Sequence, residues 1–103
     1  MFDFLKKMFA GAPSVDYQQL AQQGALILDV RSTGEFKGGH IPGSTNIPLD
    51  QLAGKIQSIS RQGKPVIAVC RSGARSAMAV EMLRREGVEA YNGGAWGSLQ
   101  RKL

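Results

Sequence analysis

The sequence predicts a small α/β domain in which helices cover both faces of a parallel sheet. Two continuous apolar runs, Ala25–Val30 and Pro65–Cys70, have the length and composition of strands buried on both sides. Segments with apolar residues at helical spacing alternate with these runs, as is typical of parallel sheets. Ligands of such folds bind beyond the carboxyl ends of the strands, so the residues that follow the two runs are where we expect the chemistry.

The first half of the chain is expected to hold one helix, one strong strand and a turn-rich stretch. A helix is expected over Tyr17–Gln23, because Asp16 can cap it and a glycine follows it. After the first apolar run, residues 31–48 contain four glycines and two prolines. This composition leaves room for one helical turn near Glu35 and one short strand over 44–47.

The second half is expected to supply three helices and two strands. Asp50 is expected to cap a helix that precedes the second apolar run, and Arg75–Glu86 forms the best helical pattern after it. Val88–Tyr91 is expected to be a last short strand, and Gly93–Gly94 to turn the chain into a terminal helix bearing Trp96. The expected buried faces are Leu52, Ile56 and Ile59 in the helix after Asp50, and Ala77, Val80, Met82 and Leu83 in the helix Arg75–Glu86.

Composition and charge exclude several classes of protein. One hundred and three residues, 43% of them hydrophobic, suffice for one core. A single cysteine and a single histidine exclude an internal disulfide and the usual four-ligand zinc site, and no apolar run approaches the roughly 20 residues of a membrane helix. The net charge of +5 favours anionic partners, but the basic residues are scattered and not interleaved with aromatic ones, which argues against nucleic-acid binding.

The first thirteen residues differ from the rest of the chain. Their large apolar residues recur at helical spacing, and two lysines interrupt the apolar stretch that a secretory signal requires. We therefore expect a cytoplasmic protein with an amphipathic extension over residues 1–13 and one domain over residues 14–103. The extension is interpreted as a short helix packed on the domain, and a membrane-surface or partner-binding helix is the alternative.

Cys70 stands where a buried strand ends and a helix begins. Backbone N–H groups converge at such a point and bind anions, and here a thiolate would be the anion. Its pKa would fall from about 8.5 toward 7 or below, which makes a nucleophile at neutral pH. The two arginines, the glycine and the two serines that follow have no role in a core, so we interpret Cys70 as catalytic and not as a small buried hydrophobe. The expected anion-binding loop is Arg71, Ser72, Gly73, Ala74, Arg75 and Ser76.

Each polar residue of this loop has two possible roles. Arg75 would clamp an anionic donor or stabilise the thiolate, and its alternative is to pair with an acid at the start of the helix. Arg71 is expected to point outward and draw anions in, or else to be a solvated surface residue. Ser72 and Ser76 could donate hydroxyl hydrogen bonds to the sulfur or cap turns.

The end of the first strand also carries charged residues. Asp29 and Arg31 are expected on one face of the strand, with Arg31 close enough to Glu35 to pair across a turn. We interpret these three residues as structural support, because ion-pair networks commonly brace loops without doing catalysis. His40 lies in a glycine- and proline-rich turn where its ring can satisfy local backbone groups, so we assign it no catalytic role.

Taken together, the segments DVRSTGEFKGGHIPGSTNIP (residues 29–48) and CRSGARS (residues 70–76) resemble the rhodanese, or single-domain sulfurtransferase, family. The resemblance covers the chain from about Val15 onward. It implies a parallel sheet of about five strands flanked by helices. It also implies that Cys70 attacks a sulfane sulfur donor, carries the sulfur as a persulfide and passes it to an acceptor, with thiosulfate and cyanide as the usual test pair.

The loop length separates this chemistry from that of related phosphatases and arsenate reductases. Four residues lie between Cys70 and Arg75, where those enzymes have five. A shorter loop makes a smaller cradle, which suits a persulfide sulfur better than a tetrahedral oxyanion.

Two classes of function follow from the sequence. The first is a sulfurtransferase that takes sulfur from a small anionic donor and passes it to a thiol, to cyanide or to a protein acceptor. Such an enzyme is expected to be a monomer and to need no cofactor, metal or nucleic acid. The alternative is a low-turnover persulfide-sensing or partner-docking module, which the amphipathic N-terminal segment would favour.

Overall fold

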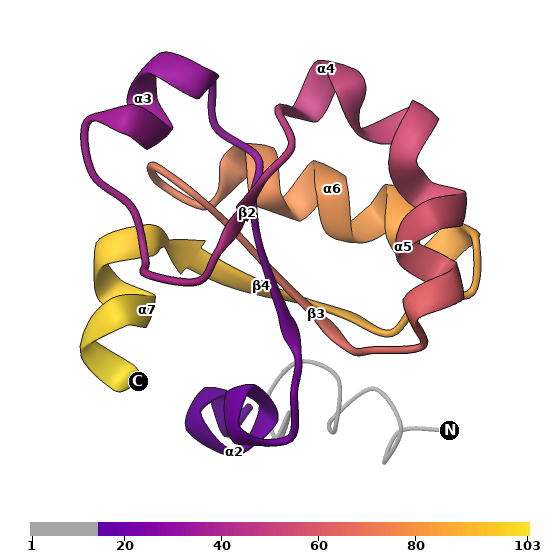
Figure 1. Cartoon of the computed structure of the whole chain (residues 1–103), viewed down its shortest axis with the longest axis horizontal. Coiled ribbons are helices and arrows are strands. Elements are labelled where there is room, and N and C mark those ends of the chain that lie inside the picture. Colours follow the sequence, from indigo (N-terminus) through magenta and orange to yellow (C-terminus); the bar gives the residue numbers. More distant parts are fainter. Residues whose placement is uncertain (1–14) are drawn as a thin grey trace, which may run out of the picture.

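The computed structural model describes residues 15–103, in which helices and strands alternate along the chain (Figure 1). The strands form one sheet of order β2-β1-β3-β4, with every neighbouring pair parallel. The elements are α2 (Tyr17–Gln22), β1 (Leu26–Asp29), α3 (Thr33–Lys37), β2 (Thr45–Asn46), α4 (Leu49–Leu52), the 3₁₀ helix η1 (Ala53–Lys55), α5 (Ile56–Gln62), β3 (Val66–Cys70), α6 (Ala74–Arg85), β4 (Ala90–Ala95) and α7 (Trp96–Lys102).

The sheet separates two apolar layers, because alternate residues of a strand point to opposite faces. One layer packs Leu28, Val66, Ala68 and Cys70 against α4, α5 and α6. The other packs Ile67 and Val69 of β3 against the helices α2 and α7. All five residues of β3 are buried, so its carboxyl end delivers Cys70 from the middle of the molecule to the edge where the sheet ends.

The predicted fold class is confirmed, with one difference in the strand count. Residues 15–103 contain four strands, not about five. The first three lie where an apolar or turn-bounded run predicts them, whereas β4 covers Ala90–Ala95 and not the expected Val88–Tyr91. The fifth strand was implied only by the family resemblance. The expected extension over residues 1–13 lies outside the described residues, and no helix within residues 15–103 has the length and apolarity to span a membrane.

The helix expected after Asp50 begins earlier and is not continuous. The N-cap of α4 is Pro48, so Asp50 lies in the first turn and caps nothing. Pro48 has the fixed φ that suits a helix start, here −54°. The expected buried residues of this region, Leu52, Ile56 and Ile59, are buried across α4 and α5, and the cap of α2 by Asp16 is as expected.

In α6, Val80 and Leu83 are buried as expected and Met82 is half-buried, whereas Ala77 is exposed. Ser76 and Ala79 take the buried positions on that side of the helix. The buried polar Ser76 contacts Cys70 there, which the apolar pattern of the helix could not indicate.

Gly93 and Gly94 belong to β4 and do not form the expected turn before α7. The register of β4 against β3 shifts between Ala68 and Val69, so β4 carries a β-bulge. A Cβ at Gly93 would lie 2.9 Å from methyl groups of Ile67 and Val69, closer than side chains pack, and Gly94 has φ of +76°. The glycines therefore allow the strand to continue where a turn was expected.

Candidate active site

The loop Arg71–Gly73 connects β3 to α6 and curls around the sulfur of Cys70. The turn requires Gly73, whose φ of +103° is accessible to glycine at little cost. This conformation aims the Gly73 N–H at Cys70 Sγ over 2.9 Å, and the Ser76 N–H points at the same sulfur over 3.4 Å. Cys70 is 1% exposed, whereas the next two residues of the loop, Arg71 and Ser72, are exposed.

These donors favour the ionised form of Cys70. Burial raises the pKa of the Cys70 thiol, but the hydrogen bonds that the ionised sulfur accepts from the Ser76 hydroxyl and amide and from the Gly73 and Ser72 amides outweigh it, so the pKa lies below its ordinary value. The described charged groups contribute no direct hydrogen bond to the sulfur. The loop therefore stabilises a thiolate chiefly through hydrogen-bond donors.

Arg75 takes the alternative role foreseen for it and pairs with an acid. Its two terminal nitrogens lie 2.7 and 3.0 Å from the carboxylate oxygens of Glu35 in α3. Through this pair Arg75 lowers the pKa of Glu35 to about 2. Glu35 in turn is the main reason why the pKa of Arg75 is raised, and the nearby charge of Cys70 adds to the effect. A direct role of Arg75 in donor binding stays a prediction.

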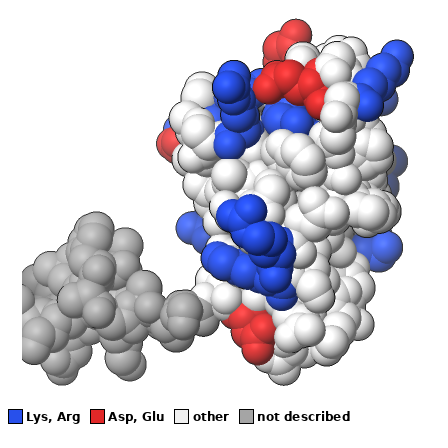
Figure 2. Space-filling view, turned by 90° about the vertical axis from the view of Figure 1, so that its left-hand side faces the viewer, with Lys and Arg blue, Asp and Glu red and all other residues white. Residues whose placement is uncertain are grey.

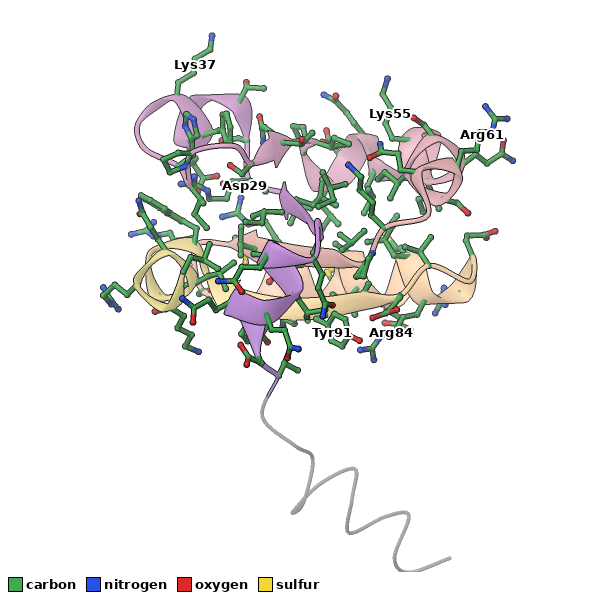
Figure 3. All side chains as sticks on the ribbon, turned by 60° about the horizontal axis from the view of Figure 1, so that its bottom comes forward. Asp29, Lys37, Lys55, Arg61, Arg84 and Tyr91 are labelled. Atoms are coloured by element: carbon green, nitrogen blue, oxygen red, sulfur yellow. The ribbon has the colours of Figure 1, made fainter. Side chains whose placement is uncertain are left out.

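Asp29 and Arg31 form a buried ion pair at the end of β1, and Figure 3 shows Asp29 inside the molecule while Lys37 points outward. Arg31 donates to both Asp29 oxygens and to the carbonyl of Gly39, and its guanidinium lies 4.7 Å from the centroid of the Trp96 ring. These contacts link β1 to the segment after α3 and to α7, which is what a structural brace does.

The pairing expected between Arg31 and Glu35 is wrong in its detail. Arg31 reaches only the backbone carbonyl of Glu35, over 3.3 Å. The Glu35 side chain closes a capping box with Ser32 at the start of α3, and this places its carboxylate toward Arg75. His40 satisfies a local backbone group as expected: its Nδ1 lies 2.8 Å from the Phe36 carbonyl and its ring stacks on Phe36.

Asn92 is a site residue that the sequence analysis missed. Its side chain lies in hydrogen-bond distance of Ser76 Oγ (2.6 Å) and of the Gly73 carbonyl (3.1 Å), so it joins β4 to the Cys70 loop. The sequence signal was weak, because Asn92 lies 16 residues after Ser76 in a stretch interpreted as a turn. Only its position beside two glycines in a strand pattern pointed to an irregular backbone.

A shallow pocket of about 290 Å³ adjoins the loop, between α3 and α7. Among its lining residues Arg71 makes no ion pair with any residue from 15 to 103, so it is a free cation at the mouth of the site. Figure 2 faces this side of the molecule and shows several groups of basic side chains with fewer acidic ones. A larger pocket of about 380 Å³ lies between α5 and α6, and no cysteine lines it.

Within the described part of the chain, no three His, Cys, Asp or Glu side chains gather as metal ligands do. The candidate site therefore consists of a single thiol surrounded by hydrogen-bond donors.

The comparisons with known proteins identify the family. Residues 14–96 match the family profile of the rhodanese-like domain. The chain belongs to the rhodanese-like domain family. Its fold agrees with the crystal structure of SSP1007 from Staphylococcus saprophyticus, which is 27% identical with a TM-score of 0.68 over 81% of this chain and 88% of that one. The human single-domain sulfurtransferase TSTD1 is 29% identical with a TM-score of 0.63, over 84% of this chain and 89% of that one.

Sequence relatives of this rhodanese-like domain include longer proteins. The uncharacterized protein YqhL of Bacillus subtilis is 46% identical over 66% of this chain and 54% of its own length. A tRNA sulfurtransferase of Thermoplasma acidophilum is 36% identical over 65% of this chain and 13% of its own length. The chain thus spans about half, or much less, of the curated relatives it matches. Some of these longer relatives carry the name sulfurtransferase.

Proposed function

We propose that this rhodanese-like domain is a sulfurtransferase that carries sulfane sulfur as a persulfide on Cys70. The observation that supports this most is the convergence of the Gly73 and Ser76 amides on the sulfur of the sole cysteine, at the end of a buried parallel strand. An isolated structural cysteine has no need of such donors, whereas a thiolate nucleophile does.

The proposed reaction has two steps that balance in atoms and charge. The Cys70 thiolate attacks the outer sulfur of thiosulfate, the S–S bond of thiosulfate breaks, and sulfite leaves with the bonding electron pair. Cys70 then carries a persulfide with one negative charge on the outer sulfur. An acceptor nucleophile, cyanide in the simplest case, attacks that outer sulfur, forms thiocyanate and returns Cys70 as a thiolate. The amides that stabilise the thiolate before the first step stabilise it again when the second step returns it.

Donor recognition in this proposal rests on Arg71. It is exposed and unpaired among residues 15–103, whereas Arg75 is already held by Glu35. A free cation at the mouth of the site attracts small anions and loses strength as salt screens it. Because Cys70 is 1% exposed, attack on the donor also requires a small opening of the loop around the sulfur.

The covered sulfur is also the observation that favours a second candidate function. A domain that forms its persulfide slowly and holds it would act as a persulfide sensor or docking module with low turnover. The two functions share the persulfide and differ in whether the acceptor removes it repeatedly. Phosphate-ester hydrolysis has less support, because Arg75, which would have to bind the oxyanion, is committed to Glu35.

The deciding experiment measures intact mass after treatment with thiosulfate and then with cyanide. The wild-type protein is expected to gain the mass of one sulfur atom and to lose it to cyanide, while Cys70→Ala gains nothing. Continuous thiocyanate formation that disappears in Cys70→Ala supports the enzyme. A single turnover per chain supports the sensor.

A second variant, Arg71→Ala, tests donor recognition separately, because it leaves Cys70 and its amide donors in place. It is expected to raise the KM for thiosulfate, with a smaller effect at high salt, and to keep the persulfide. A wild-type protein that gains no sulfur at any donor concentration, or that hydrolyses an aryl phosphate through Cys70 as fast as it transfers sulfur, would contradict the proposal.

A further inference from the structure

The neighbours of Asn92 fix which end of its side-chain amide is the oxygen and which is the nitrogen. Its Oδ1 lies 2.9 Å from the N–H of Gly94, which can only donate. Its Nδ2 lies 3.1 Å from the carbonyl of Gly73, which can only accept. These two contacts fix the orientation of the amide, because a flipped amide would place donor against donor and acceptor against acceptor.

The fixed amide determines where the Ser76 hydroxyl hydrogen lies. Ser76 Oγ and Asn92 Oδ1 are 2.6 Å apart, and only the hydroxyl can supply the hydrogen between them. The same Oγ lies 3.4 Å from Cys70 Sγ. Since a hydroxyl has one hydrogen, the Cys70 thiol must supply the hydrogen of that second contact. In this orientation the Ser76 hydroxyl suits the protonated thiol, and it has to turn away from Asn92 before it can donate to an ionised sulfur.

We propose that Asn92 is a positioning residue that controls the ionisation of Cys70 by holding the hydroxyl hydrogen of Ser76. When Cys70 ionises, the hydroxyl has to leave Asn92 and donate to the sulfur, so Asn92 and the thiolate compete for one hydrogen. When sulfur transfer moves the negative charge to the outer atom of a persulfide, Sγ becomes neutral and the hydroxyl can return to Asn92. This inference rests on the proposed function only in taking Cys70 as the reacting group.

Other charged or titratable groups around the sulfur do not take part in this competition. Arg75 of α6 is paired with Glu35 of α3, and Asp29 of β1 is paired with Arg31. Arg71 is exposed. From α2, the Tyr17 hydroxyl donates to the backbone carbonyl of Asn92 over 2.8 Å and leaves the Asn92 side chain free to act on Ser76. Of these groups, none has a hydrogen bond to Ser76 Oγ within residues 15–103.

The test is a double-mutant cycle read out by the pH dependence of alkylation. Iodoacetamide reacts with the thiolate, and Cys70 is the only cysteine, so the rate against pH gives its apparent pKa. Four proteins are compared: wild type, Ser76→Ala, Asn92→Ala and the double variant. In the wild-type background Ser76→Ala is expected to raise the apparent pKa of Cys70 by only a fraction of a unit, because the hydroxyl gives up its bond to Asn92 when it donates to the thiolate. In the Asn92→Ala background, where the hydroxyl is free to donate to sulfur, it is expected to raise the apparent pKa by about one unit.

The cycle removes the effect of a merely loosened loop. Any loss of order caused by Asn92→Ala is common to both members of that background and cancels in the difference. An equal rise of the apparent pKa on Ser76→Ala in both backgrounds would overturn the proposal, as would no rise in either. Because no sulfur donor is used, the result stands apart from whether the protein transfers sulfur.

Two further variants sharpen the result. Asn92→Asp keeps an oxygen acceptor for Ser76, so in that background Ser76→Ala is expected to change the apparent pKa of Cys70 by as little as in the wild type. The added negative charge raises the apparent pKa of Asn92→Asp and of its double variant with Ser76→Ala. Asn46→Ala is the matched control. Asn46 of β2 donates hydrogen bonds to the carbonyls of Asp29 and Arg31 at the same edge of the sheet and makes none to Ser76. Its replacement is therefore expected to leave the apparent pKa of Cys70 unchanged.

Discussion

The ends of β1 and β3 lie side by side at the carboxyl edge of the sheet and use polar groups in opposite ways. At the end of β1, Asp29 and Arg31 satisfy each other, and Arg31 uses its remaining donors on backbone carbonyls. At the end of β3, two backbone donors have no charged partner until the sulfur ionises. The amides of Gly73 and Ser76 point at the sulfur of Cys70, which carries a charge only after it ionises.

This difference separates a structural brace from a candidate reactive site where both are built from buried polar residues. In a brace the charged groups are paired with one another, as Asp29 and Arg31 are. At the end of β3, by contrast, the Cys70 sulfur faces two amide donors that a neutral thiol does not need. Each end also receives an asparagine from the neighbouring strand. Asn46 binds only backbone carbonyls, whereas Asn92 binds the hydroxyl that contacts the sulfur.

The largest effect that separates the two ends is on stability. Asp29→Ala is expected to reduce the free energy of unfolding by about 3–5 kcal/mol, because it leaves the charge of Arg31 buried and unpaired. Urea denaturation followed by circular dichroism measures it. The control is Glu81→Ala, which removes an exposed pair with Arg85 and is expected to cost at most about 0.5 kcal/mol.

If Asp29→Ala proved as mild as Glu81→Ala, the pair would not be a brace. If it instead kept stability and changed the alkylation of Cys70, Asp29 would belong to the reactive end, and the comparison between the two strand ends would fail.

The next effect concerns the bulge that positions Asn92. Gly93→Ala is expected to cost about 1–3 kcal/mol, because its Cβ would meet methyl groups of Ile67 and Val69 at 2.9 Å in a closely packed sheet. Gly54→Ala is the matched control, since no heavy atom lies within 4 Å of its Cβ, and it is expected to be neutral or to stabilise by up to about 1 kcal/mol. Thermal unfolding of the two variants compares them directly. Equal melting temperatures would mean that β4 can shift away from β3 at no cost.

The sequence could predict the Cys70 loop because all of its determinants are local. A buried strand, a glycine and a helix follow one another within a few residues, and the peptide geometry then brings the amides to the sulfur. Asn92 could not be found in this way. Its role depends on the pairing of β4 with β3 and on a bulge, and neither is encoded within the loop that it contacts.

The error at Glu35 has a similar cause. Proximity along the chain predicted a pair with Arg31, and Arg31 does reach the backbone of Glu35. The direction of the Glu35 side chain was decided by the capping box at the start of α3 and by an arginine 40 residues away. Sequence spacing predicts which backbones meet more reliably than which charged side chains pair.

The smallest effect distinguishes Arg75 from His40 as an influence on Cys70. The charge of Cys70 raises the pKa of Arg75, so by reciprocity Arg75 stabilises the thiolate. Arg75→Ala removes this cation and also leaves the Glu35 carboxylate without its partner, and both changes disfavour a negative sulfur. The apparent pKa from iodoacetamide alkylation is therefore expected to rise. We expect less than about one unit, because the Arg75–Glu35 pair is about one-third exposed and solvent screens it.

His40→Ala is the matched control in this measurement. The ring of His40 is stacked on Phe36 and bound to a backbone carbonyl of its own turn, so the alkylation curve is expected to coincide with that of the wild type. The sign is fixed by the charges: removing a cation near an acid raises the pKa of the acid, and removing a group that does not contact it leaves the pKa unchanged. A rise with His40→Ala and none with Arg75→Ala would mean that Cys70 is activated by a Cys–His pair. In that case the hydrogen-bond donors of the loop would only shape the cradle, and the contrast between the two strand ends would need a different explanation.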